Sequence, residues 1–129
     1  MSSLEKVVYN ILHNAGVNFQ QEKIFSDCYN GKYRYDFHLP DENILLEVHG
    51  RQHYEFNSKF YKNRSDFLKA QERDRRKASY ALANRIALYC IPYWEIDNLK
   101  TIDDLFNPKF RVRSSFHNDD VWRAHQNLR

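Results

Sequence analysis

Residues 33–53 read YRYDFHLPDENILLEVHGRQH, and this stretch predicts two short strands joined by a tight turn. Before the turn, aromatic and aliphatic side chains alternate with polar ones, as in a strand with one buried face. Pro40–Asn43 consists of residue types that reverse the chain, and the mostly apolar run Ile44–His49 follows it. A β-hairpin is therefore the element around which the remaining chain must be arranged.

The hairpin places two carboxylates opposite each other. If Leu39 and Ile44 flank the turn, the register pairs Asp36 with Glu47, and their Cβ atoms would lie about 5 Å apart. Like charges in this arrangement are destabilising, and a divalent cation with oxygen ligands is the usual compensation. The alternative is that each acid is an ordinary solvated strand residue. We interpret the pair as a site for Mg²⁺.

Imidazole groups lie next to this pair of acids. His49 shares a strand face with Glu47, and Gln52 and His53 follow one turn later. Gly50 would permit a backbone bend that brings His53 back over the end of the strand. The hairpin thus combines two carboxylates with two imidazoles, which is the composition of a metal-assisted active site.

The remaining chain supplies helices and further strands. Ser2 and Glu5 have the spacing of a helix capping box, and Gly16 suits the position past the helix end. The patterns predict a helix at 2–15, strands at 17–25 and 86–93, a loop and long helix at 58–84, a short helix at 99–106 and a helix from 119 or 120. We therefore expect an α/β (α+β) fold, with a central mixed β-sheet of about four strands flanked by helices.

Two acids outside the hairpin are further candidates. Glu5 borders the apolar stripe of the first helix, where it would either close the cap on the Ser2 amide or lean over the sheet toward a water or metal. Asp74 falls on the same face of the long helix as Phe67 and Ala78. It would either pair with a neighbouring arginine or point at the site.

Charge is unevenly distributed along the chain. Residues 58–77 hold eight Lys or Arg against three Asp or Glu, whereas residues 1–57 hold five against eight. An acidic centre beside a basic helix suits a phosphate backbone held around a metal. The alternative is an ordinary solvated helix face. The candidate phosphate-binding residues are Lys69, Arg73, Arg75, Arg76 and Lys77.

Length and composition set the remaining expectations. The 129 residues suit one domain with a modest core, which we place at 1–107, followed by a basic, aromatic tail at 108–129 of undecided structure. Neither a signal-peptide pattern nor an apolar run of about 20 residues is present, so we expect no membrane association. Cys28 and Cys90 lack metal-ligand spacing, which favours free thiols and a cytoplasmic location.

The order of these elements and the residues Asp36, Glu47-Val48-His49 and Gly50-Arg51-Gln52-His53 resemble the PD-(D/E)xK nuclease superfamily. The closer resemblance is to the branch of very short patch repair (Vsr-like) endonucleases and EDxHD homing endonucleases, over roughly residues 3–105. The resemblance implies a restriction-endonuclease-like core. The catalytic residues that it implies are Glu5, Asp36, Glu47, His53 and Asp74.

The resemblance also implies a chemistry. Asp36, Glu47 and the Val48 carbonyl would hold Mg²⁺, which Mn²⁺ would replace, and the enzyme would hydrolyse DNA phosphodiester bonds. His53 would take a proton from the attacking water or steady the developing charge. The superfamily usually has lysine two residues after the strand glutamate. Here that residue is His49, which we treat with Gln52 as accessory.

Three other functions remain open from the sequence. The chain would be a structure-selective nuclease if it acted, as a homodimer for example, on branched or mismatched DNA. It would be a non-catalytic nucleic-acid-binding module if it kept the fold without turnover. The aromatic tail would suit an assembly protein.

Overall fold

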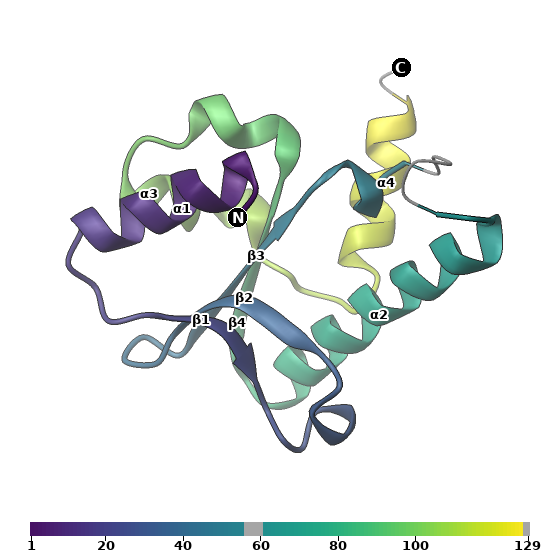
Figure 1. The fold of residues 1–129 in the computed structure, drawn as a ribbon, viewed down its shortest axis with the longest axis horizontal. Helices are drawn as coiled ribbons and strands as arrows, with labels where there is room; N and C mark the ends of the chain where they lie inside the picture. Colours follow the sequence, from purple (N-terminus) through teal and green to yellow (C-terminus); the bar gives the residue numbers. More distant parts are fainter. Residues whose placement is uncertain (56–60, 128–129) are drawn as a thin grey trace.

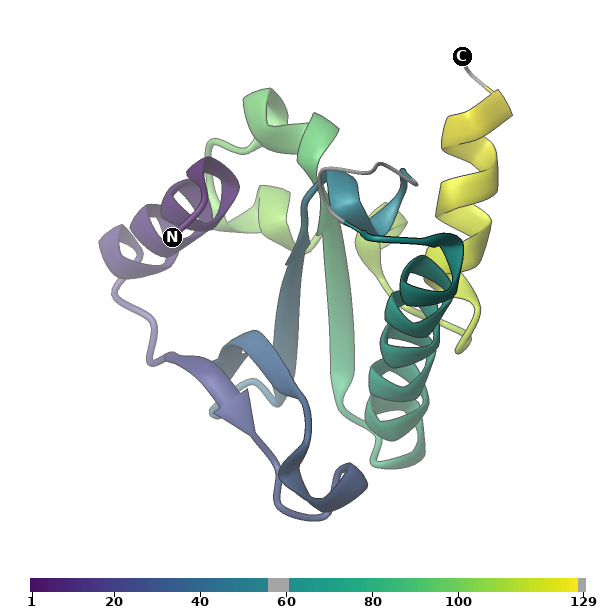
Figure 2. The same cartoon turned by 45° about the vertical axis from the view of Figure 1, so that its right-hand side comes forward.

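The computed structural model describes residues 1–55 and 61–127 and contains one four-stranded mixed sheet with helices on both faces (Figures 1 and 2). The strands are β1 (Gln20–Ile24), β2 (Arg34–Leu39), β3 (Ile44–His49) and β4 (Ala87–Pro92). The helices are α1 (Ser3–Asn14), α2 (Arg64–Ala83), α3 (Ile102–Leu105) and α4 (His117–Asn127). The predicted fold class is confirmed. The first residues of the predicted segment 58–84 lie outside the described residues.

The sheet has the order β1-β2-β3-β4. β1 and β2 are antiparallel, β2 and β3 are antiparallel, and β3 and β4 are parallel. A parallel neighbour requires a crossover, and α2 is that crossover. The hairpin register is the predicted one, because Leu39 pairs with Ile44 and Phe37 pairs with Leu46.

The sheet separates two hydrophobic cores. α1 and α3 cover one face, where Leu46 and Val48 of β3 pack with Val8 and Leu12 of α1. In both views these helices lie on one side of the sheet, and α2 and α4 lie on the other (Figures 1 and 2).

On the α2 face the core is smaller. Leu45 of β3 packs there against Ala78 and Ala81, whose short side chains let the helix approach the sheet. Strand alternation directs Glu47 and His49 to this same face, as the sequence predicted. The two polar groups of β3 are therefore enclosed between the sheet and α2.

β2 bends at Asp36. The β1–β2 ladder pairs Gln21 with Phe37 and resumes at Lys23 with Tyr35, skipping Glu22. Glu22 has a φ of +53°, in the left-handed region that non-glycine residues rarely adopt. The bend divides the aromatic residues of β2, since Phe37 joins the α1-side core and Tyr35 the α2-side core. Regular alternation would have placed both rings on one face, so this feature differs from the sequence pattern.

Two local signals at the ends of α1 were read correctly. The Ser2 side chain accepts a hydrogen bond from the Glu5 amide at 3.1 Å, and Gly16 follows α1 with a φ of +70°. Gly50 has a φ of −73°, which any residue adopts, but a Cβ at this position would lie 2.6 Å from Gln52 Oε1, so the predicted hindrance is present. The chain turns there through a short 3₁₀ helix, Arg51–His53, and not through a glycine-specific conformation.

The segment 108–127 packs onto the domain. Phe110 and Val112 are buried in the two cores, and α4 lies beside α2. Cys28 and Cys90 are buried free thiols, as predicted. Across residues 1–55 and 61–127, every helix is too short or too polar to cross a bilayer.

Candidate active site

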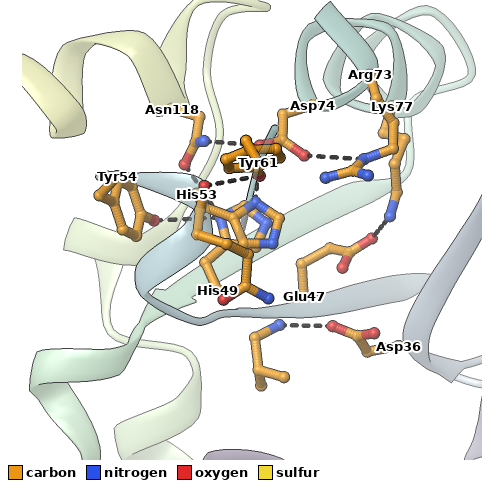
Figure 3. Close-up of polar contacts among 12 residues, drawn as sticks. Asp36, Glu47, His49, His53, Tyr54, Tyr61, Arg73, Asp74, Lys77 and Asn118 are labelled. Carbon is orange, nitrogen blue, oxygen red and sulfur yellow. Dashed lines mark hydrogen bonds and ion pairs between the residues drawn. The ribbon is translucent and has the colours of Figure 1, made fainter. Parts of the chain in front are cut away.

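An open cleft of about 800 Å³ lies between α1, the bend of β2 and the middle of α2. Most of the site residues predicted from the sequence line this cleft. Those that line it are Glu5, Asp36, Glu47, Val48, Gln52, His53, Arg73 and Lys77. Asp74 and His49 lie directly behind His53 and support it (Figure 3).

Asp36 is fixed at the point where β2 leaves the ladder. Its Oδ2 atom accepts a hydrogen bond from the Val48 amide at 2.8 Å. The carboxylate thus replaces a backbone acceptor on the β2 side of β3. Continuing the register beyond Phe37–Leu46 places Asp36 across from Glu47. The ladder itself ends at Phe37 and Leu46, but Asp36 and Glu47 line the same cleft and lie close enough for Asp36 to affect the pKa of Glu47.

Glu47 is an enclosed carboxylate, only 4% exposed. Burial raises its pKa well above the ordinary value, Lys77 lowers it, and the adjacent Asp36 carboxylate raises it further. The pKa of Glu47 is raised because two carboxylates share one cationic partner at a site shielded from water. This group of side chains therefore favours one more positive charge, supplied by a proton or by a cation.

Lys77 provides the cationic partner. It extends from α2, is 9% exposed, and forms an ion pair with Glu47 while its Nζ also donates to the Arg34 carbonyl. Burial lowers the pKa of Lys77, but the carboxylates of Glu47, Asp36 and Asp74 together raise it above the ordinary value, so the ammonium form is retained. The sequence predicted a phosphate-binding lysine here, not a partner of Glu47. The signal for the enclosed position was its spacing of three residues from Asp74, which directs both toward the sheet.

His53 and Asp74 form a hydrogen-bonded dyad. His53 Nδ1 lies 2.8 Å from Asp74 Oδ2, and the Asp74 side chain is 5% exposed. Burial alone would raise the pKa of Asp74, but the charge and hydrogen bond of His53, with His49 and Arg73, hold it well below the ordinary value. An ionised carboxylate only accepts hydrogen bonds, so His53 Nδ1 carries its hydrogen. In the neutral ring, Nε2 then has the free lone pair.

His49 supports this dyad from below. Its ring stacks on His53 with centroids 3.9 Å apart and planes 6° from parallel. Its Nδ1 lies 3.0 Å from Asn118 Oδ1 and 3.1 Å from the Tyr54 hydroxyl. Burial and the neighbouring His53 lower the pKa of His49 well below its ordinary value, which keeps the ring neutral. His49 is thus a platform for His53.

His49, His53 and Asp74 also have ligand atoms within 4.8 Å of one another, a spacing that a metal ion would need. Imidazole with carboxylate suits transition metals. The parallel stack argues against a shared ion, because lone pairs in the planes of stacked rings do not converge on one point. Asp36 and Glu47 instead offer the carboxylate oxygens that hard cations prefer.

The predicted basic residues of α2 are divided between two sides of the helix. Arg73 lies at the edge of the cleft, with Nε 3.7 Å from Asp74 Oδ1. Lys69, Arg75 and Arg76 line a separate hollow on the outer side of α2. The cleft gains two exposed cations that we did not nominate, Lys32 and Arg34. Their position just before Asp36 in the sequence was the signal for them.

The other nominated residues have smaller contacts. Glu5 lines the cleft, and its Oε1 accepts from the Ser2 hydroxyl at 3.4 Å, whereas the predicted cap used the Ser2 amide. Gln52 is exposed and its carbonyl accepts from the Tyr61 hydroxyl at 2.8 Å. Asn118, which contacts both His49 and Asp74, was not predicted, and we find no pattern in 108–129 that marks it.

No family model, curated protein or solved structure matches this chain. The functional assignment therefore depends on the geometry of the cleft.

Proposed function

We propose that this protein is a Mg²⁺-dependent endonuclease that hydrolyses DNA phosphodiester bonds. One observation carries the proposal: the carboxylates of Asp36 and Glu47 and the His53–Asp74 dyad meet at a single cleft. In metal-assisted phosphodiester hydrolysis, a pair of carboxylates can hold the metal ion and an oriented imidazole can act as the general base.

The residues of the cleft fit a hard divalent cation. Asp36 and Glu47 supply carboxylate oxygens, and the resemblance to PD-(D/E)xK nucleases adds the Val48 carbonyl. The raised pKa of Glu47 supports this fit, because burial beside Asp36 favours an added positive charge even with Lys77 present. When bound, Mg²⁺ would offset negative charge on the scissile phosphate and make a bound water more acidic.

His53 acts as the general base in this proposal. Its Nε2 has the free lone pair, because Asp74 accepts the Nδ1 hydrogen. Asp74 holds the ring in that tautomer and stabilises the imidazolium that forms when Nε2 takes a proton from the attacking water. Such positioned bases contribute about 10² to 10⁴ in rate.

Lys77 supplies the positive charge that PD-(D/E)xK nucleases usually obtain from the lysine two residues after the strand glutamate. The superfamily lysine position is occupied by His49, but Lys77 brings an ammonium group to Glu47 from α2. In this place it would stabilise negative charge that develops on the phosphate oxygens. The ion pair with Glu47 holds the ammonium in position before substrate binds.

Cations at the edge of the cleft would bind the flanking phosphates. Lys32, Arg34 and Arg73 are the residues in that position. Contacts of this kind hold the backbone without reading sequence, and they weaken as salt rises.

The experiment is a cleavage assay on purified protein with linear, nicked, mismatched and four-way DNA, in Mg²⁺ or in EDTA. We expect Mg²⁺-dependent cleavage that Asp36→Asn and Glu47→Gln abolish while DNA binding persists. Preference for one branched or mismatched substrate would identify the structure-selective alternative. DNA binding without cleavage in Mg²⁺ would overturn the enzyme assignment in favour of a non-catalytic module.

A further inference from the structure

The amide of Asn118, in the first turn of α4, joins the two residues that support His53. Its Nδ2 atom donates to Asp74 Oδ2 at 2.8 Å, and its Oδ1 lies 3.0 Å from His49 Nδ1 (Figure 3). Asn118 is 8% exposed, so both contacts are shielded from water. A single side chain from the C-terminal segment therefore reaches both groups behind the candidate base.

The orientation of this amide follows from the charge of Asp74. An ionised carboxylate accepts only, so the NH₂ end of Asn118 must face it. The carbonyl end then faces His49, and a carbonyl oxygen accepts only. His49 Nδ1 must in turn carry a hydrogen to make this contact, which leaves Nε2 of the neutral ring unprotonated. The Tyr54 hydroxyl, 3.1 Å from Nδ1, is a second partner of that nitrogen.

His53 is held in two directions, and Asn118 is connected to both. Asp74 fixes the ring through Nδ1, and His49 fixes it by stacking at 3.9 Å. Without the Asn118 amide, Asp74 loses a hydrogen bond to its Oδ2 and His49 loses the acceptor that determines its tautomer. Both supports would gain rotational freedom at the same time.

α4 is itself anchored so that Asn118 has a defined position. Asp119 accepts two hydrogen bonds from Arg75, both at 2.9 Å. At the other end, Gln126 Nε2 donates to the Tyr54 carbonyl at 2.9 Å, and the His125 ring stacks on Trp94 with centroids 4.4 Å apart. The helix is thus fixed at both ends against α2 and the turns after β3 and β4.

We infer that Asn118 is a positioning residue for the His53 imidazole, acting through Asp74 and through the tautomer of His49. α4 therefore completes the active site. The catalytic consequence rests on the proposed nuclease function, but the tautomer assignment does not. The two can be tested separately.

The first test uses ¹⁵N NMR of the imidazole rings in metal-free protein at neutral pH. Wild type is expected to show His49 with hydrogen on Nδ1. Asn118→Leu, of similar size but without hydrogen-bonding groups, is expected to shift His49 at least threefold toward the Nε2–H form. Asn118→Asp keeps an acceptor for His49 and should keep the Nδ1–H form. Tyr54→Phe should also keep it, if Asn118 determines the tautomer.

The second test is kinetic, with Mg²⁺ and the preferred DNA substrate. Asn118→Leu is expected to lower kcat tenfold or more with KM within twofold of wild type. Asp120→Asn, an exposed change on the same helix, is the matched control and should leave both unchanged. A stable Asn118→Leu protein with wild-type tautomer and kcat would overturn the inference.

Failures of the two proposals are distinguishable. An Nε2–H tautomer of His49 in wild type overturns the positioning role whatever the activity, and needs no variant to fold. Absence of cleavage by wild type, with the expected tautomers, overturns the nuclease proposal and leaves the assignment of Asn118 to the orientation of His49 and Asp74 in place.

Discussion

The Lys77 ammonium pairs with the Glu47 carboxylate inside the cleft, although the two residues lie on different elements, α2 and β3. Both side chains are nearly enclosed, with exposures of 11% and 6%. Removing one member of such a pair leaves a buried charge without compensation, whereas removing both does not. The pair therefore contributes to the fold as well as to the site.

Lys77→Met should lower the free energy of unfolding by about 3–5 kcal/mol, the usual cost of an uncompensated buried charge. Combining it with Glu47→Gln should recover part of that loss, because the unpaired carboxylate is removed. Urea unfolding of the two single variants and the double variant at neutral pH measures the coupling. Strictly additive effects would contradict the ion pair.

Asp74→Asn should reduce kcat about 10²- to 10⁴-fold, in the range that positioned bases contribute, with little change in KM. An amide at this position can donate to His53 Nδ1 and favour the wrong tautomer. His53→Ala should cost at least as much, and the double variant no more than the worse single one. Independent, multiplying losses would show that the two residues do not act as a unit.

The stability contributed by Asp74 should depend on pH in a defined direction. Its folded-state pKa is depressed below the unfolded value of about 3.9, so the contribution is fully present above the unfolded pKa. It is lost as pH falls through the folded-state pKa. The difference in unfolding free energy between wild type and Asp74→Asn should therefore be largest near neutral pH and shrink in acid. A constant difference from about pH 7 to pH 3 would oppose the assigned direction.

Mg²⁺ affinity should rise with pH because of Glu47. Burial and Asp36 raise the pKa of this carboxyl group, so at lower pH the cation must displace a proton. Calorimetry in two buffers of different ionisation enthalpy should detect proton release on binding. Glu47→Gln should remove the release together with most of the affinity. Equal affinity from about pH 6 to pH 9 would count against Glu47 as a ligand.

Two arginines of α2 provide a matched pair for DNA binding. Arg73 lies at the cleft, whereas Arg76 lies in the outer hollow and pairs with Glu72 at 2.8 Å. Arg73→Gln should weaken DNA binding and reduce the slope of log K against log salt by about one. Arg76→Gln should change neither quantity appreciably. Fluorescence anisotropy over a range of salt concentrations compares them, and equal losses would place DNA on both sides of α2.

The hairpin was predictable because its determinants are local. The turn Pro40–Asn43 and the apolar residues beside it fix the register from Phe37–Leu46 to Leu39–Ile44, and this register predicted that Asp36 would lie near Glu47. The face shared by Glu47 and His49 follows from the same period. These parts of the site needed no information from distant residues.

The remaining parts of the site depend on long-range packing. The bend of β2 at Asp36 involves a positive φ at Glu22, for which glutamate gives no sequence signal. Helical periodicity placed Asp74 toward the sheet, but Lys77 was predicted to bind phosphate. Its pairing with Glu47 depends on how α2 packs against β3, which the helical pattern does not reveal. Asn118 acquires its role only when α4 docks beside α2.

The hydrogen bond from the Val48 amide to Asp36 would constrain which residues evolution accepts at position 36. An oxygen at position 36 accepts from the Val48 amide of the inner strand β3 whether or not the protein cleaves a phosphodiester. Alanine there would leave that backbone N–H unsatisfied, at a cost of about 1–3 kcal/mol. In descendants that abandon turnover, we expect asparagine or aspartate to persist at 36 after 47 and 53 have drifted. Aspartate at position 36 therefore indicates the fold, whereas Glu47 and His53 together indicate the chemistry.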